Sequence, residues 1–167
     1  MRKGMIRVIY GDGRGKTAAA VGRAITSAER EKKIIMIQFL KGSVTRCGAF
    51  LQRLEPEFRL FSFEKREAAF DTLRPEEKQE EIANIQNGMN FAKKVMVTGE
   101  CDILILDEVL GLLDYGIVSR EEILTLLQGK NEDMEVILTG RVFPEDMNDW
   151  ADEIVHVENR KGGRAIV

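Results

Sequence analysis

A glycine-rich loop near the start of the chain carries residue types that bind phosphate groups. Residues 11–17 read Gly-Asp-Gly-Arg-Gly-Lys-Thr, after the apolar run Met5–Tyr10 and before an alanine-rich segment typical of a helix. Closely spaced glycines let successive backbone N–H groups point at phosphate oxygens, and the N-terminus of a following helix attracts negative charge. Lys16 would reach the outer phosphates, and the Thr17 hydroxyl would bind Mg²⁺. The loop therefore predicts a nucleotide-phosphate site.

An ordinary glycine-rich turn before a helix is the alternative interpretation. In the common phosphate-loop pattern a glycine precedes the Gly-Lys pair by five residues, whereas Tyr10 occupies that position here. The order of strand, loop and helix around Gly-Lys-Thr nevertheless favours phosphate binding.

Two adjacent carboxylates follow a later apolar run. Residues 103–106 are all apolar, and Asp107 and Glu108 come directly after them. A carboxylate in this position binds Mg²⁺ directly or through water in many nucleotide sites. The pair could also be the acidic start of a helix, because Asp and Glu are favoured near helix N-termini. Beside the glycine-rich loop the metal interpretation is favoured, with Thr17, Glu108 and Asp107 as candidate ligands.

Polar residues also follow two other apolar runs. Lys41 comes after the second run, where it could contact an anion or be an ordinary surface lysine. Thr139 and Arg141 follow the fifth run, and their hydroxyl and guanidinium groups suit a terminal phosphate. Lys16, Lys41 and Arg141 are therefore the candidate catalytic cations.

An aromatic-rich segment between residues 58 and 70 is harder to interpret. Phe70 lies in a stretch that resembles a loop, where an exposed ring would suit a flat hydrophobic ligand. Packing of Phe70 onto its own domain is the alternative. The single histidine, His156, lies in the last apolar run and is predicted to be structural, away from the strand ends that form the site.

The elements that must position these residues alternate along the chain. Near-continuous apolar runs are typical of parallel strands covered on both faces, and the segments between them read as helices. The predicted helices are Lys16–Arg30, one opened by Pro75, one capped by Ser119 and ended by Gly129, and one from Pro144 to Trp150. This predicts one doubly wound α/β domain over residues 1–167, with ligands at the carboxyl ends of the strands. The predicted strands are Met5–Tyr10, Ile34–Phe39, Phe58–Phe63, Asp102–Leu106, Glu135–Leu138 and Glu153–Val157.

Composition limits the classes of function. The chain has 25 Lys and Arg against 28 Asp and Glu, and the net charge of −3 argues against general binding of nucleic acid or anionic membranes. Cys47 and Cys101 have no metal-ligand spacing, and no apolar stretch is long enough for a signal peptide or a membrane span. A cytoplasmic location is therefore expected.

Taken in order, these motifs resemble the P-loop ATP:corrinoid adenosyltransferases, also called cob(I)alamin adenosyltransferases. That family has a shortened glycine loop, matched here over residues 11–20 with Ala18 in place of a second threonine. Its Val-Gln-Phe-x-Lys-Gly, Leu-Asp-Glu and Thr-Gly-Arg motifs are matched by residues 37–42, 106–108 and 139–141. The resemblance covers about residues 6 to 161. It implies a RecA-like P-loop NTPase fold, in which the strand ending at Thr139 lies between those ending at Tyr10 and Leu106.

The resemblance also implies an activity: transfer of the 5′-deoxyadenosyl group of ATP to Co(I) of a corrinoid such as cobalamin, with release of triphosphate and with Mg²⁺ as cofactor. A homodimer and a reductase partner are expected, without nucleic acid or membrane partners. The residues expected to bind the nucleotide and corrinoid are Gly11, Asp12, Gly13, Arg14, Gly15, Lys16, Thr17, Ala18, Thr139 and Phe70.

Two alternatives to this activity remain open on the sequence. One is a RecA-like protein that hydrolyses ATP with Glu108 activating water, and the other is a non-catalytic ATP-binding module. Where the family has an aromatic Gly-Phe-x-Trp loop, this chain has Ser-Phe-Glu-Lys at residues 62–65. Corrinoid is therefore expected to bind more weakly than ATP.

Overall fold

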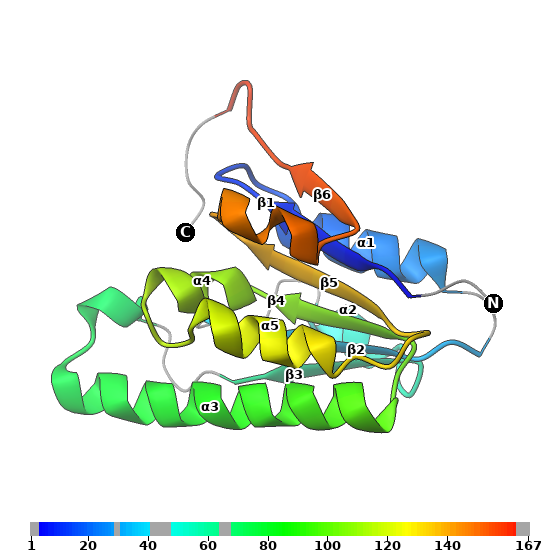
Figure 1. The fold of residues 1–167 in the computed structure, drawn as a ribbon, viewed down its shortest axis with the longest axis horizontal. Coiled ribbons are helices and arrows are strands. Elements are labelled where there is room, and N and C mark those ends of the chain that lie inside the picture. Colours follow the sequence, from blue (N-terminus) through cyan, green and yellow to red (C-terminus); the bar gives the residue numbers. More distant parts are fainter. Residues whose placement is uncertain (1–3, 29–30, 41–47, 64–67, 163–167) are drawn as a thin grey trace.

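The computed structural model describes residues 4–28, 31–40, 48–63 and 68–162, and it contains a single six-stranded sheet (Figure 1). All strand pairs are parallel, and the order across the sheet is β3-β2-β4-β5-β1-β6. The strands are β1 (Ile6–Tyr10), β2 (Ile34–Gln38), β3 (Phe58–Ser62), β4 (Ile103–Asp107), β5 (Glu135–Gly140) and β6 (Glu153–His156).

Every predicted strand is present, with ends shifted by no more than two residues. The shifts matter at the carboxyl ends, because Asp107 is the last residue of β4 and Thr139 lies inside β5. Side chains of successive strand residues point to opposite faces of a sheet. The directions of Asp107 and Thr139 are therefore fixed by their strands and not by a loop.

The helices cover both faces of the sheet. One core contains side chains of α1 (Lys16–Ser27) and α2 (Gly48–Gln52) together with Ile103 and Ile105. The other contains side chains of α3 (Pro75–Thr98), α4 (Val109–Asp114) and α5 (Arg120–Gln128) together with Leu104 and Leu106. Since alternate residues of one strand enter opposite cores, the prediction of strands buried on both faces is confirmed for the central strands β2, β4 and β5, whereas most residues of β6, at the edge of the sheet, are exposed.

Local signals explain where several helices begin and end. Pro75 opens α3, and Gly99, at φ 66°, ends it. The Ser119 hydroxyl accepts a hydrogen bond from the Glu122 N–H, while the Ser119 N–H donates to the Glu122 carboxylate, as the capping-box pattern predicts. Two 3₁₀ helices, η1 (Phe70–Thr72) and η2 (Glu145–Trp150), complete the described helical elements. The short helices α2, α4 and η1 were not predicted.

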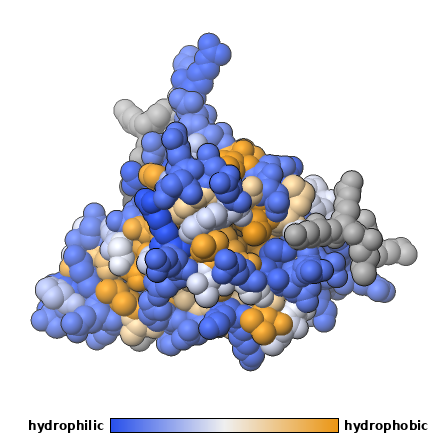
Figure 2. Space-filling view, viewed as in Figure 1, coloured by the Kyte–Doolittle hydropathy of each residue, from blue (hydrophilic) through white to orange (hydrophobic). Residues whose placement is uncertain are grey.

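The position of β5 defines the type of fold. β5 pairs with β1 on one side and β4 on the other, so the strand bearing the glycine-rich loop and the strand bearing Asp107 are not neighbours. This is the RecA-like arrangement of P-loop NTPases, as predicted. The displayed face is mainly hydrophilic with several small hydrophobic patches (Figure 2). Within the described part of the chain, no helix combines the length and apolarity needed to cross a membrane.

Candidate nucleotide site at the carboxyl edge of the sheet

Three polar side chains lie in a row across the carboxyl edge of the sheet. Gln38 of β2 is in register with Asp107 of β4, and Thr139 of β5 occupies the next position along the row. Each continues the alternation of apolar residues that face α1, and each side chain is fully buried. Burying polar groups is costly unless they are hydrogen-bonded, so the row must be satisfied by specific partners.

Asp107 is the centre of these hydrogen bonds. Its Oδ1 accepts from the Thr17 hydroxyl at 2.9 Å and from the Thr139 hydroxyl at 2.8 Å, and its Oδ2 accepts from the Gln38 side-chain amide at 3.3 Å. Thr17 lies in the first turn of α1, directly after the glycine-rich loop. One carboxylate therefore joins the loop, β2, β4 and β5. We call Asp107, Thr17, Thr139 and Gln38 the Asp107 cluster.

Glu108 takes an unusual backbone conformation next to this cluster. Its φ of 62° lies in the left-handed region, which costs a residue with a Cβ about 1 kcal/mol or more. Its N–H donates to the Thr139 hydroxyl at 2.8 Å, so the hydroxyl that donates to Asp107 also holds Glu108. The described contacts therefore bring two of the three candidate metal ligands, Asp107 and Thr17, together, and the third, Glu108, is joined to the cluster through its backbone N–H.

The cations predicted from sequence lie around the glycine-rich loop where the structure describes them. The Lys16 ammonium donates to the Gly13 carbonyl at 2.9 Å, so it folds back over the loop. Arg141 follows β5, and its Nε lies 3.5 Å from Asp12 in the loop, with both side chains well exposed. Arg141 is therefore beside the loop, and its role as a catalytic cation stays a prediction. Lys41 lies outside the described residues.

The outer side of the glycine-rich loop is held by the chain just after β6. The Gly13 N–H donates to the Val157 carbonyl at 3.1 Å, and the Arg14 N–H donates to the Asn159 side-chain oxygen at 3.3 Å. A Cβ at Gly13 would lie 2.7 Å from the Val157 oxygen, and one at Gly11 would lie 2.2 Å from it. Glycine is thus required at both positions by this close approach. The Gly13 N–H was expected to face a phosphate and instead faces residue 157.

An aromatic pair, Phe70 and Tyr115, lies within electrostatic range of Arg141 and Glu108. The rings of Phe70 and Tyr115 are 5.0 Å apart, and the Lys78 ammonium is 5.7 Å from the Phe70 ring. Burial raises the pKa of Tyr115, to which the charge of Asp71 adds, while Arg141 opposes the shift. Phe70 therefore packs within its own chain while staying partly accessible, and Tyr115 is within electrostatic range of Arg141.

Two positions at the site were misjudged or missed on the sequence. His156 is the last residue of β6, and its exposed ring stacks on Tyr10 with the centroids 4.7 Å apart. It is therefore at the carboxyl edge beside the loop, and not away from it as predicted. Gln38 was not predicted as a site residue. The pattern Ile34-x-Met36-x-Gln38 could have indicated it, because it puts a polar residue at the end of a row of buried apolar ones.

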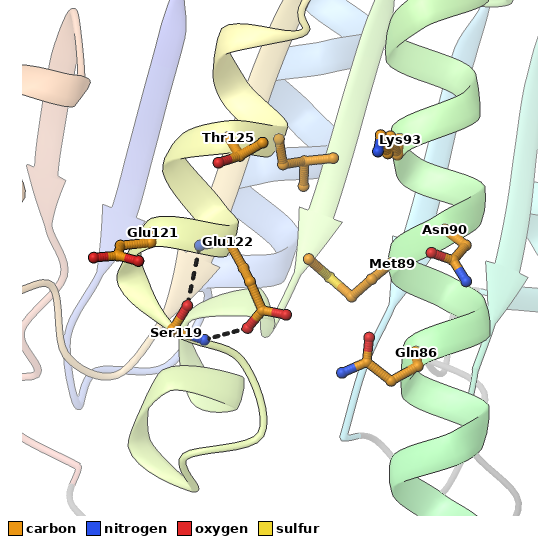
Figure 3. Close-up of a pocket in the computed structure, with 9 residues that line it drawn as sticks. Gln86, Met89, Asn90, Lys93, Ser119, Glu121, Glu122 and Thr125 are labelled. Atoms are coloured by element: carbon orange, nitrogen blue, oxygen red, sulfur yellow. Dashed lines mark hydrogen bonds between the residues drawn. The ribbon is translucent and has the colours of Figure 1, made fainter.

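A separate cavity lies between α3 and α5 (Figure 3). It has a volume of about 370 Å³, and the dashed lines in the figure show the Ser119–Glu122 hydrogen bonds that cap α5. None of its lining residues belongs to the predicted site. They are Gln86, Met89, Asn90, Lys93, Ser119, Glu121, Glu122, Thr125 and Leu126.

Comparisons with known proteins agree on the family. The profile of the family described as "ATP:corrinoid adenosyltransferase BtuR/CobO/CobP" matches residues 2–163. The chain is 29% identical over 152 residues to a corrinoid adenosyltransferase of Escherichia coli K12, covering 91% of this chain and 75% of that protein.

A second curated relative gives the same result. The chain is 28% identical over 155 residues to the corrinoid adenosyltransferase CobA of Salmonella typhimurium, with coverage again of 91% and 75%.

Among solved structures, domain III of the Thermotoga maritima replication initiation protein DnaA is similar at a TM-score of 0.44 and 15% identity, covering 94% of this chain and 55% of that one. The profile match over nearly the whole chain shows that the protein belongs to the ATP:corrinoid adenosyltransferase family.

Proposed function

We propose that this protein transfers the 5′-deoxyadenosyl group of ATP to the Co(I) centre of a corrinoid. The electron pair of Co(I) attacks the ribose C5′, a Co–C bond forms, and the C5′–O bond breaks. The pair from that bond leaves with triphosphate, and the cobalt is formally oxidised to Co(III). The observation that carries the proposal is the Asp107 cluster, which joins the glycine-rich loop to β4 and β5 in a chain of this family.

The protein's part in this reaction is positioning and charge stabilisation. The N–H groups of Gly15 and Lys16 lie at the start of α1, where the backbone N–H groups of a helix lack intrahelical acceptors. They are suited to binding phosphate oxygens, together with the ammonium of Lys16 and the guanidinium of Arg141. These groups would stabilise negative charge as triphosphate leaves, which lowers the barrier if they are already in place.

The residues present fit a magnesium ion. Mg²⁺ prefers oxygen ligands and keeps several waters, so few protein groups are needed. No group of three carboxylate, histidine or cysteine side chains with metal-site geometry occurs among residues for which positions are described. Thr17 and Asp107 supply a hydroxyl and a carboxylate 2.9 Å apart, and Glu108 follows in sequence. Thr17 with Asp107 or Glu108 would hold the ion, which would neutralise phosphate charge when bound.

The corrinoid requires an apolar surface near the nucleotide. Phe70 and Tyr115 offer partly accessible rings, with Tyr115 in electrostatic range of Arg141, which lies beside the loop. We assign Phe70 to the corrinoid side on this basis. Weaker binding of corrinoid than of ATP stays a prediction, as do a cytoplasmic location, a homodimer and a reductase partner.

One assay separates the proposal from its alternatives. The protein is mixed with ATP, Mg²⁺ and chemically reduced cobalamin under anaerobic conditions, and the Co(I) absorbance and phosphorus products are followed. Loss of Co(I) absorbance with one triphosphate per adenosylcobalamin supports transfer. Inorganic phosphate formed without corrinoid would indicate ATP hydrolysis instead. ATP binding without turnover would indicate a binding module.

A further inference from the structure

The glycine-rich loop is hydrogen-bonded on its outer side to residues 157–159, a segment far away in sequence. Arg14 and Asn159 are 145 positions apart, yet the Arg14 N–H donates to the Asn159 side chain. The adjacent Gly13 N–H donates to the Val157 carbonyl, and the Val157 N–H donates in turn to the Tyr10 carbonyl at 2.7 Å. Residues 157–159 therefore attach the loop to the end of β1 from outside.

We infer that Asn159 is a positioning residue for phosphate binding, acting through the backbone of Arg14. The inference rests on the proposed role of the glycine-rich loop. Val157 contributes a backbone carbonyl, which no substitution removes, whereas Asn159 contributes its side chain. A substitution at Asn159 can therefore remove one of the two hydrogen bonds that hold the loop.

The physical basis is the cost of ordering a loop. Two hydrogen bonds hold the N–H groups of Gly13 and Arg14 towards residues 157–159. The N–H groups of Gly15 and Lys16 lie at the start of α1, where the proposed function places a phosphate. A loop held in this form before binding loses less conformational entropy when a phosphate arrives. Without Asn159 the Arg14 peptide can turn, and the ligand must order it. Asn159 therefore raises affinity without touching the ligand.

The test measures affinity for two ligands that share only the phosphate chain. Calorimetry with ATP and with inorganic tripolyphosphate, both with Mg²⁺, is performed on the unaltered protein, on Asn159→Ala and on Glu158→Ala. Glu158→Ala is the matched control, because it alters an exposed neighbouring side chain and leaves both hydrogen bonds in place. Loss of one neutral hydrogen bond predicts an affinity about three- to tenfold weaker for both ligands in Asn159→Ala only.

Two further measurements distinguish positioning from a general effect on the fold. Amide hydrogen exchange at Arg14 should become faster in Asn159→Ala, while the melting temperature without ligand changes little. Asn159→Asp keeps an acceptor oxygen and should restore the slow exchange of the Arg14 amide. A purely structural role would lower the melting temperature and leave both affinities unchanged well below it.

The outcomes separate this inference from the proposed function. If the unaltered protein binds both ligands and Asn159→Ala binds them equally well, the role of Asn159 is wrong and the function stands. If Asn159→Ala weakens binding but the unaltered protein adenosylates no corrinoid, the positioning role stands and the transferase proposal fails. If the unaltered protein binds neither ligand, both are refuted.

Discussion

Two polar clusters lie on the same face of the sheet, under the same helix, and they are built in opposite ways. At the carboxyl edge, the described donors to the buried Asp107 carboxylate are side chains of Thr17, Thr139 and Gln38, which are uncharged groups. Hydrogen bonds from uncharged groups fix the direction of a carboxylate and add no positive charge of their own. The cluster therefore orients a negative charge at the edge where ligands of α/β sheets bind.

The second cluster is centred on Arg7, at the amino end of β1. Its guanidinium donates to Glu135 of β5 at 2.7 Å and to Glu153 of β6 at 2.6 Å, and Arg23 of α1 forms another ion pair with Glu153. Here two cations face two carboxylates, so charge is balanced inside the cluster. Burial alone would raise the pKa of Glu153, but its hydrogen bonds and charge interactions with Arg7 and Arg23 hold that pKa below its usual value.

The comparison separates a structural role from a functional one within the same few strands. Ion pairs among β1, β5, β6 and α1 connect elements and leave little charge for a ligand. Hydrogen bonds around Asp107 connect α1, β2, β4 and β5 at the carboxyl edge of the sheet, and they keep the Asp107 carboxylate in position. Substitutions in the Arg7 cluster should therefore change stability, and substitutions around Asp107 should change ligand binding and rate.

The largest expected effect comes from Lys16→Ala. Removing a preorganised positive charge from the leaving triphosphate should lower the rate of adenosyl transfer by about a thousandfold. The melting temperature should stay nearly constant, because the Lys16 ammonium contacts only the Gly13 carbonyl among the described hydrogen bonds. Single-turnover loss of Co(I) absorbance measures the rate. Near-normal transfer by Lys16→Ala would refute the phosphate site.

Asp107→Asn should have the next largest effect. The amide keeps the size of the side chain and an oxygen that can accept from Thr17 and Thr139, so the fold should persist. Loss of the negative charge should reduce transfer about a hundredfold at low Mg²⁺. The measurement is the rate as a function of Mg²⁺ concentration. An unchanged magnesium dependence would remove Asp107 from the metal site.

Arg7→Ala should act on stability. The change leaves Glu135 and Glu153 without their shared cation in a partly buried place, which should lower the free energy of unfolding by about 2 kcal/mol. Urea denaturation measures this, and ATP affinity of the folded variant serves as the control. A change in ATP affinity larger than the change in stability would contradict the separation of the two clusters.

Thr139→Val tests the link between Asp107 and Glu108. Valine has a similar shape but no hydroxyl, so the Glu108 N–H loses its acceptor and Asp107 loses a donor. Because Glu108 holds a left-handed conformation, its position should relax, and transfer should fall about tenfold. Thr139→Ser, which keeps the hydroxyl, should retain most of the rate. Equal rates for the valine and serine variants would exclude the hydroxyl's role.

The smallest effect is expected for Glu153→Gln, through its pH dependence. A carboxyl with a lowered pKa in the folded protein stabilises it above the unfolded-state value of 4.5, and this stabilisation is lost as pH falls through the folded-state pKa. The variant should be less stable by about 1 kcal/mol at most at pH 7. The difference should shrink as pH falls towards 3, as measured by urea denaturation. A difference independent of pH would contradict this.

Much of the fold could be predicted because local patterns determine it. Apolar runs, several of them nearly continuous, marked all six strands, and Pro75 and the Ser119–Glu122 capping box marked two helix starts. The position of β5 followed from the family resemblance and is confirmed. The short helices α2 and α4 are only five and six residues long, too short for a clear helical period.

The site was predictable in composition but not in its contacts. The glycine-rich loop, Asp107, Thr139 and Arg141 were all selected, because each follows or ends an apolar run. The sequence could not show that Thr17 contacts Asp107. That contact depends on the register between strands and on where the first turn of α1 lies relative to the carboxyl end of β4. Nor could it show Asn159 at Arg14, because no local pattern reports a contact between segments so far apart.

The hydrogen bonds from the glycine-rich loop to residues 157–159 also affect when the site can form during protein synthesis. A chain emerges from the ribosome with its N-terminal part first. The loop is made early, yet Val157 follows Gly13 by more than a hundred positions and Asn159 follows Arg14 by 145 positions. A nascent chain that ends before β6 therefore has the whole loop sequence but lacks the groups that shape it. Nucleotide binding by ribosome-bound chains of increasing length would report completion of the sheet rather than appearance of the loop.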